Sequence, residues 1–85
     1  MIGRIVCSRA GRDKGSFMVV VGEEEGALFV CDGKERPLEK PKLKNPKHLA
    51  VTNTILKKEQ FLSNKSLRRA LNEYCGVKEI SKEGE

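Results

Sequence analysis

Three cations lie close together near the start of the chain, at Arg9, Arg12 and Lys14. Gly11 and Gly15 stand among them, and glycine lets the backbone take positive φ angles or approach another group closely. A short loop of this kind concentrates positive charge, and its backbone N–H groups can also donate to phosphate oxygens. Spacing alone supports a phosphate-binding loop and an ordinary solvated loop equally well.

The segments on either side of this loop have the composition of β-strands. In residues 2–9, Ile5 and Cys7 alternate with Arg4, Val6 and Ser8, and residues 16–22 contain an unbroken apolar run from Phe17 to Val21. Alternation and β-branched residues favour strand over helix. The two segments therefore predict a hairpin with a cationic tip. Asp13 within the tip is interpreted as a turn residue, because its carboxylate can bond to its own backbone.

Three further short strands are predicted, at residues 27–31, 35–38 and 48–52. The first follows an acidic turn at residues 23–26 and ends at Asp32-Gly33, a dipeptide typical of turns. Pro37 cannot donate a ladder hydrogen bond, so the second strand is assigned to an edge of the sheet.

The lysine-rich segment before the last strand is predicted to be a loop. Pro41 and Pro46 are expected to prevent regular sheet pairing there, and the loop should end in a helical turn at residues 46–48. Five short strands joined by tight turns suit a small β-barrel, which hides strand edges.

The apolar period changes after Ser63 from that of a strand to that of a helix. Apolar side chains recur at intervals of three and four residues, at Leu67, Ala70, Leu71, Tyr74 and Cys75. We expect a helix at residues 65–75, with Ser63 or Asn64 as its amino-terminal cap and Gly76 as its carboxy-terminal cap. Residues 53–62 are ambiguous, with a short helix from Lys57 as one interpretation.

These elements define one domain. Residues 1–56 should form the barrel, residues 57–80 a helical extension packed on it, and residues 81–85 a disordered tail.

The charge is positive overall but unevenly distributed. The formal net charge is +5, and residues 1–22 carry four basic and one acidic side chain. Residues 23–40 carry three basic and six acidic side chains, whereas residues 42–58 carry five lysines and no acid. Two basic regions flanking an acidic one favour an anionic partner, although a solvated face explains residues 42–58 equally well. Lys65, Arg68 and Arg69 are interpreted first as a solvated helix face and second as a further anion-binding surface.

Several classes of function are disfavoured by the sequence. No serine has a suitable His and acid partner, and no nucleotide-binding glycine loop occurs, so we expect no enzymatic activity and no cofactor. Cys7, Cys31 and Cys75 are odd in number and widely spaced, so buried reduced thiols are expected, with no disulfide framework and no metal site. No apolar run reaches the roughly 20 residues that span a bilayer, and the expected location is the cytoplasm.

The segment from Ile2 to Val21 resembles the KOW motif, in which an apolar alternation leads through a basic loop to a glycine and a second strand. A wider match covers about the first fifty-two residues and adds Asp32-Gly33 and Asn45-Pro46-Lys47-His48-Leu49. In this extent the chain resembles the family of large-subunit ribosomal protein fourteen of archaea and eukaryotes.

The resemblance implies an SH3-like five-stranded barrel that binds structured RNA, with ribosomal RNA as the expected partner and ribosomal proteins as further neighbours. The RNA-binding residues are then expected to be Arg9, Gly11, Arg12, Lys14, Gly15, Lys42, Lys44, Lys47 and His48. Phe17, Phe29 and Tyr74 are assigned to the core, so recognition of RNA shape and backbone is expected in place of base stacking. The free protein is expected to be a monomer.

Two alternatives remain open at this point. SH3-like barrels also bind proteins, and such a partner would dock through Glu23, Glu24 and Glu25 or through the apolar stripe of the helix. The KOW motif also occurs in transcription-elongation accessory factors.

Overall fold

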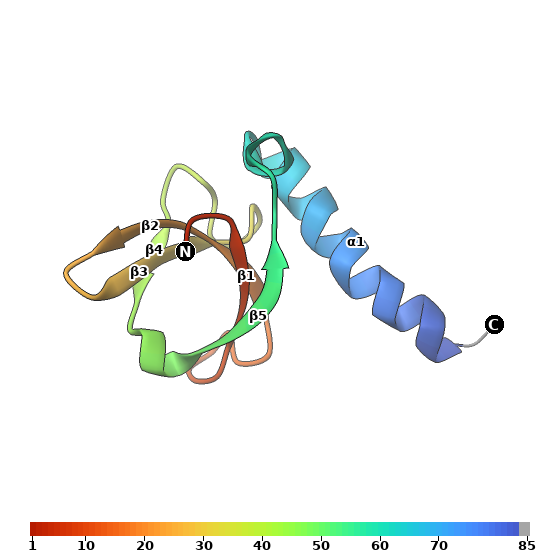
Figure 1. Ribbon diagram of the computed structural model, residues 1–85, viewed down its shortest axis with the longest axis horizontal. Coiled ribbons are helices and arrows are strands. Elements are labelled where there is room, and N and C mark those ends of the chain that lie inside the picture. Colours follow the sequence, from red (N-terminus) through yellow and green to blue (C-terminus); the bar gives the residue numbers. More distant parts are fainter. Residues whose placement is uncertain (84–85) are drawn as a thin grey trace.

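The computed structural model describes residues 1–83, with side chains for residues 1–75. Within this range it has five strands, two short 3₁₀ helices and one α-helix (Figure 1). The strands are β1 Arg4–Ser8, β2 Phe17–Glu24, β3 Ala27–Cys31, β4 Lys42–Lys44 and β5 Leu49–Ile55. The helices are η1 Pro46–His48, η2 Lys58–Phe61 and α1 Asn64–Glu83.

All five strands belong to one antiparallel sheet in the order β4-β3-β2-β1-β5. In Figure 1 the sheet curls around a central space, with α1 projecting from one side. The predicted mainly β fold with a carboxy-terminal helix is confirmed. The sheet is not closed into a barrel, because β4 and β5 are not hydrogen-bonded neighbours among the described residues.

The central strands are buried on both faces. Paired residues of antiparallel strands share a face, and Val19 of β2 is paired with both Ile5 and Cys31. The opposite face carries Val20, paired with Val30. All five side chains are fully buried, which explains why β2 has an unbroken apolar run in place of an alternation.

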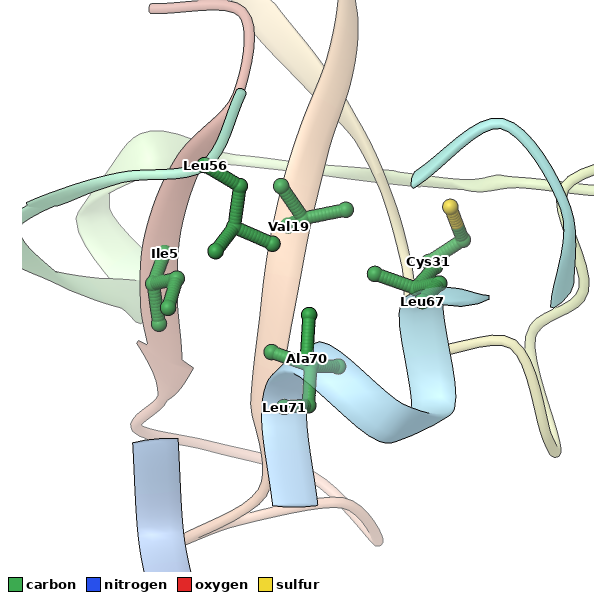
Figure 2. Packing of buried hydrophobic residues seen from close by; sticks show 7 residues of the cluster. All are labelled: Ile5, Val19, Cys31, Leu56, Leu67, Ala70 and Leu71. Carbon is green, nitrogen blue, oxygen red and sulfur yellow. The ribbon is translucent and has the colours of Figure 1, made fainter. Parts of the chain in front are cut away.

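Helix α1 covers the first of these two faces. It contributes Leu67, Ala70 and Leu71 to the cluster that contains Ile5 and Val19 (Figure 2). The predicted helical stripe is therefore packed inside the molecule over these three residues. A protein partner could not dock on that part of the stripe while the helix stays in place.

The second core lies on the opposite face, inside the curl of the sheet. Its members are Val6, Met18, Val20, Leu28, Val30 and Leu49. Two polar side chains, Ser8 and Lys44, are also buried. They share this face, since Ser8 is paired with Leu49 and Lys44 with Leu28. The apolar interior thus adjoins a polar cluster.

The predicted fourth strand at residues 35–38 is wrong, and Lys42–Lys44 takes its place beside β3. The cause is the turn at Asp32, whose Oδ1 accepts hydrogen bonds from the N–H groups of Lys34 and Arg36 at 2.8 and 2.9 Å. The carbonyl of Arg36 also accepts from the N–H of Asp32 at 2.9 Å. These bonds fold residues 32–36 into a closed turn. The chain therefore pairs with β3 only from Lys42 onward.

Pro41 and Pro46 therefore flank a strand without preventing it. Because β4 has only three residues, both prolines fall outside its ladder. The helical turn predicted at residues 46–48 is confirmed as η1, and the Asp32-Gly33 turn is also confirmed.

Helix α1 begins close to its predicted start and runs further than predicted. Ser63 accepts a hydrogen bond from the N–H of Ser66 at 3.1 Å, so it acts as the amino-terminal cap. The helix continues through Gly76 to Glu83, so the prediction that Gly76 ends it is wrong. The predicted tail at 81–85 is helical as far as Glu83, and its last two positions lie outside the described residues. The short helix considered from Lys57 corresponds to η2.

Candidate nucleic-acid interface

The cationic loop, residues 9–15, joins β1 to β2 through two overlapping turns. The N–H of Lys14 donates to the carbonyl of Gly11 at 3.2 Å, and the N–H of Ser16 donates to the carbonyl of Asp13 at 2.9 Å. Gly11 has a φ of 84° and Gly15 a φ of 90°, values that glycine adopts without the strain of a side chain. The two glycines thus allow the tight path that the sequence predicted.

The base of the loop is closed by backbone hydrogen bonds. The N–H of Ser8 donates to the carbonyl of Ser16 at 2.9 Å, and the N–H of Gly15 donates to the carbonyl of Ser8 at 2.8 Å. The N–H of Gly15 is therefore used within the loop. It is not the spare donor to phosphate that the glycine-rich sequence suggested.

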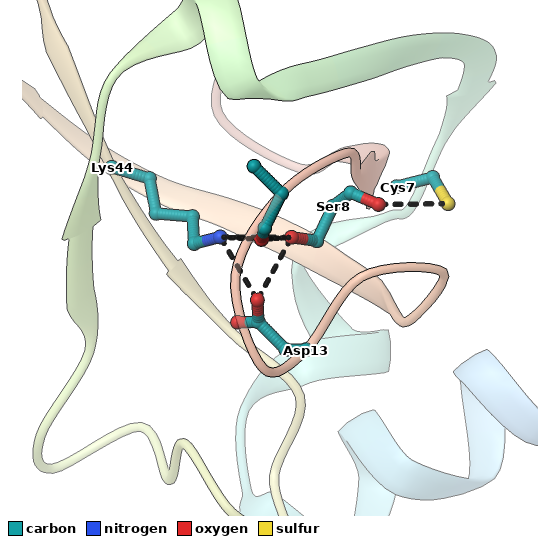
Figure 3. Close-up of polar contacts among 5 residues, drawn as sticks. Cys7, Ser8, Asp13 and Lys44 are labelled. Carbon is teal, nitrogen blue, oxygen red and sulfur yellow. Dashed lines mark hydrogen bonds and ion pairs between the residues drawn. The ribbon is translucent and has the colours of Figure 1, made fainter.

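A buried ion pair fixes the loop from beneath (Figure 3). The Nζ of Lys44 lies 3.0 Å from Asp13 Oδ1, and it donates to Ser8 Oγ at 2.8 Å and to the carbonyl of Ala10 at 3.3 Å. Ser8 Oγ in turn donates to Asp13 Oδ1 at 2.9 Å. The side chains of Lys44 and Asp13 are only 8% and 14% exposed. We call Ser8, Asp13 and Lys44 the anchoring cluster.

The anchoring cluster corrects one sequence prediction and adds to another. Lys44 was expected at the RNA surface, but its pairing with Leu28 turns its side chain to the inner face of the sheet. There the ammonium needs partners, because an unpaired buried charge is very costly. Asp13 lies in a turn and its carboxylate bonds to its own backbone, as predicted, and it also supplies the opposite charge from 31 positions away in the sequence.

The cluster also controls the ionisation of Asp13. Burial is the largest single influence and acts to raise the pKa of its carboxyl group. Hydrogen bonds from Lys44 and Ser8, together with the charge of Lys44, outweigh burial and hold this pKa below its ordinary value. Asp13 is therefore ionised at neutral pH and forms a true ion pair with Lys44.

The remaining charges of the cationic loop point to solvent. Arg9, Arg12 and Lys14 are exposed, and none of them forms an ion pair with another residue in the described part of the chain. The only acid in the loop is turned inward and neutralised by Lys44. The outer surface of the loop therefore carries three uncompensated positive charges.

The segment around η1 lies beside this loop. The N–H of Arg9 donates to the carbonyl of His48 at 2.7 Å, which joins the start of the loop to the end of η1. Asn45 caps η1 through its Oδ1, which accepts from the N–H of Lys47 at 2.9 Å. The side chains of Lys47 and His48 are exposed. Lys42 differs, since it is half-buried on β4 opposite Val30.

The structure thus brings seven of the nine predicted residues to one region: Arg9, Gly11, Arg12, Lys14, Gly15, Lys47 and His48. It places Lys44 beneath that region and Lys42 along β4. Sequence reasoning missed the anchoring cluster. The local pattern of β4 gave no sign of it, because Lys-Leu-Lys normally indicates lysines in solvent and a buried leucine. The reverse is found, with Leu43 49% exposed.

The described side chains form no metal-binding cluster, and one thiol among them has a strongly perturbed pKa. No group of three or more His, Cys, Asp or Glu side chains in this part of the chain is arranged to hold a metal ion. Cys31 is a fully buried thiol, as predicted, whereas Cys7 and Cys75 are only half-buried and the prediction is wrong for them. Burial first, and the charges of Asp32 and Glu39 second, raise the pKa of Cys31 to about 11, so the thiolate needed for nucleophilic chemistry is scarce at neutral pH.

Comparison with known protein families gives no match for this sequence. A search of curated proteins likewise finds no significant match. In residues 1–83 no helix combines the length and the apolar character needed to cross a membrane. The relation to KOW proteins therefore remains a prediction from the motif.

Proposed function

We propose that this protein binds structured RNA, with ribosomal RNA as the main partner, by docking the cationic loop on the phosphate backbone. One observation carries the proposal. The anchoring cluster neutralises the single acid of the loop from inside, and Arg9, Arg12 and Lys14 remain exposed on a backbone held by hydrogen bonds. A loop that is already ordered loses little conformational entropy when it binds.

The surroundings of the loop support the same partner. Lys47 extends the positive surface near Arg9, and His48 adds an exposed imidazole. Arginine binds phosphate oxygens in a bidentate manner, and such contacts position a protein on RNA without reading its sequence. Phe17 packs edge-on against Tyr74, with ring centroids 5.3 Å apart, so it helps to hold α1 against the sheet beside the loop.

We also propose that the fold is an SH3-like barrel of the KOW family. The curled sheet and the basic loop between β1 and β2 support this assignment. Further support comes from Lys44 of β4, which bonds to Ser8 of β1 although these strands are not neighbours in the sheet. The Lys44 side chain thus connects two strands of the curled sheet that are not paired by backbone hydrogen bonds. In this role the protein would act on cytoplasmic ribosomes, next to ribosomal proteins, and would be a monomer when free.

The test removes the three exposed charges and leaves the anchoring cluster intact. Arg9, Arg12 and Lys14 are changed together to Ala, and binding to protein-free large-subunit ribosomal RNA is measured over a range of salt concentrations. We expect affinity to fall by more than about tenfold. The slope of log affinity against log salt should become shallower by about 2 to 3.

The matched control changes Lys40, Lys57 and Lys58 to Ala, which removes the same charge from exposed positions outside the loop. This control should keep most of the affinity. Equal losses in the two variants would show that only net charge matters. Unchanged affinity in a folded loop variant would refute the proposed function.

A further inference from the structure

A groove of about 670 Å³ lies between the end of the cationic loop and α1. Gly15 and Ser16 line it from the loop, and Leu71 and Asn72 line it from the helix. Its volume is within the range of about 300 to 1,000 Å³ typical of small-ligand sites. The groove begins next to Lys14, one of the cations that the proposed function assigns to RNA.

The lining of the groove combines three kinds of chemistry. Phe17 and Leu71 provide apolar surface, and the amide of Asn72 provides both a donor and an acceptor. Lys34 and Arg68 provide two positive charges, and Asp32 provides one negative charge whose Oδ1 already accepts hydrogen bonds from the N–H groups of Lys34 and Arg36, so the lining keeps a net charge of +1. A nucleotide has the matching parts, which are a flat base with hydrogen-bonding edges and an anionic phosphate.

The walls of the groove are fixed by contacts between distant parts of the chain. Arg68 donates through Nη1 to the carbonyl of Gly33 at 2.8 Å, and its other guanidinium N–H groups can serve a phosphate. Gly33 has a φ of 78°, and a Cβ at this position would lie 2.6 Å from the carbonyl oxygen of Asn64. The turn after β3 therefore touches the backbone of α1 directly. The ring contact between Phe17 and Tyr74 fixes the helix against the start of β2.

We infer that this groove holds one unpaired nucleotide of the RNA whose backbone lies on the cationic loop. The inference rests on the proposed function and specifies which kind of RNA the protein binds. A base inside a duplex is stacked and paired, so it cannot enter the groove, whereas a bulged nucleotide can turn out of the helix. The preferred RNA is then a helical segment with an unpaired nucleotide beside the loop contact.

The experiment compares two hairpin RNAs that differ by one unpaired nucleotide in the stem. The bulged hairpin is made with each of the four bases in turn, and the fully paired hairpin is the reference. We expect the wild-type protein to prefer at least one bulged hairpin by about tenfold. Asn72→Phe, which fills the groove from an exposed helix position, should abolish this preference and keep the affinity for the paired hairpin.

Asn53→Phe is the matched control, because it makes the same replacement at an exposed position of β5 outside the groove. It should behave like the wild type. Amide chemical shifts of Ser16, Phe17 and Asn72 in the wild-type protein give a readout that needs no variant, and they should respond more to the preferred bulged hairpin than to the paired one.

Failure of this inference can be told apart from failure of the proposed function. Equal affinity of the wild type for every hairpin, a preference retained in Asn72→Phe, or equal shifts with both RNAs would overturn the groove assignment. The function would still stand if changing Arg9, Arg12 and Lys14 to Ala weakened binding to both RNAs. If that triple variant bound both RNAs as tightly as the wild type, the function and the inference that rests on it would both fall.

Discussion

The cationic loop at residues 9–15 and the lysine segment at residues 42–47 look alike in sequence but play different parts in the structure. Both are short and basic, and both were assigned to RNA. In the loop the cations are exposed and the acid, Asp13, is turned inward. In the lysine segment Lys44 is the inward residue, and it pairs with Asp13. A count of charges therefore does not tell which ones are available to a partner.

The strongest test of this difference is the loss of Lys44. We expect Lys44→Ala to lower the free energy of unfolding by about 3 to 5 kcal/mol, because it leaves the buried Asp13 carboxylate without its cation. Arg12→Ala removes a positive charge from the exposed side of the loop and should change stability by less than about 0.5 kcal/mol. Urea denaturation of the two variants gives the comparison. Similar stabilities would mean that Lys44 does not anchor the loop.

Removing both charges of the ion pair should be far milder than removing one. The double variant Lys44→Met with Asp13→Asn keeps the net charge, and the Ser8 hydroxyl, whose single proton is donated to Asp13 in the wild type, can then donate to the carbonyl of Ala10 at 3.0 Å. We expect its stability to lie within about 1 to 2 kcal/mol of the wild type, since uncharged replacements often substitute well for a buried pair.

The same double variant separates anchoring from direct RNA contact. If Lys44 only anchors the loop, the slope of RNA affinity against salt should be unchanged, because Arg9, Arg12 and Lys14 are still present. A slope shallower by about 1 would instead identify Lys44 as a phosphate contact and would contradict its assignment to the anchoring cluster alone.

Acid should weaken the anchoring cluster by a smaller amount. The pKa of Asp13 is lower in the folded protein than in the unfolded chain, so its ionisation stabilises the fold above the unfolded pKa of about 4. That contribution is lost as the pH falls through the folded pKa. We expect the wild type to lose more stability than the Lys44→Met, Asp13→Asn variant between neutral pH and pH of about 3. Parallel losses in the two proteins would show that Asp13 is not held in this way.

The smallest expected effect concerns the exposed end of the lysine segment. Lys47→Ala removes an exposed cation next to His48, whose carbonyl bonds to the N–H of Arg9, and it should reduce the salt slope of RNA binding by about 1. Lys42→Ala removes a half-buried side chain from β4 and should change that slope less. The measurement to compare is the change in salt slope, which should be larger for Lys47→Ala than for Lys42→Ala. A larger change for Lys42 would move the binding surface from the loop to β4.

Much of the fold could be predicted because its determinants are local. The first hairpin, β3 and the stripe of α1 follow from the period of their own apolar residues, and the Asp32-Gly33 turn follows from its dipeptide. The position of β4 could not be predicted. Its Lys-Leu-Lys pattern is inverted because an acid from a distant loop pairs with Lys44, and tertiary pairing then outweighs the ordinary preference of lysine for solvent.

The candidate site, like the fold, has features that could be predicted from the sequence and features that could not. The exposed cations and the two glycines of the loop could be recognised from composition and spacing. The role of Asp13 could not, since a carboxylate in a turn has a sufficient local explanation. Gly76 misled the prediction of the helix end, because a glycine inside a helical pattern weakens the helix without necessarily ending it.

The bond between Lys44 and Asp13 has a consequence for the order in which the protein is made. Synthesis proceeds from the amino terminus, so the cationic loop emerges from the ribosome well before the residue that anchors it. The nascent loop has its charges at once, but it can acquire its final shape only when the chain has grown through β4. The surface proposed to grip RNA is thus completed late, after most of the sheet has been synthesised.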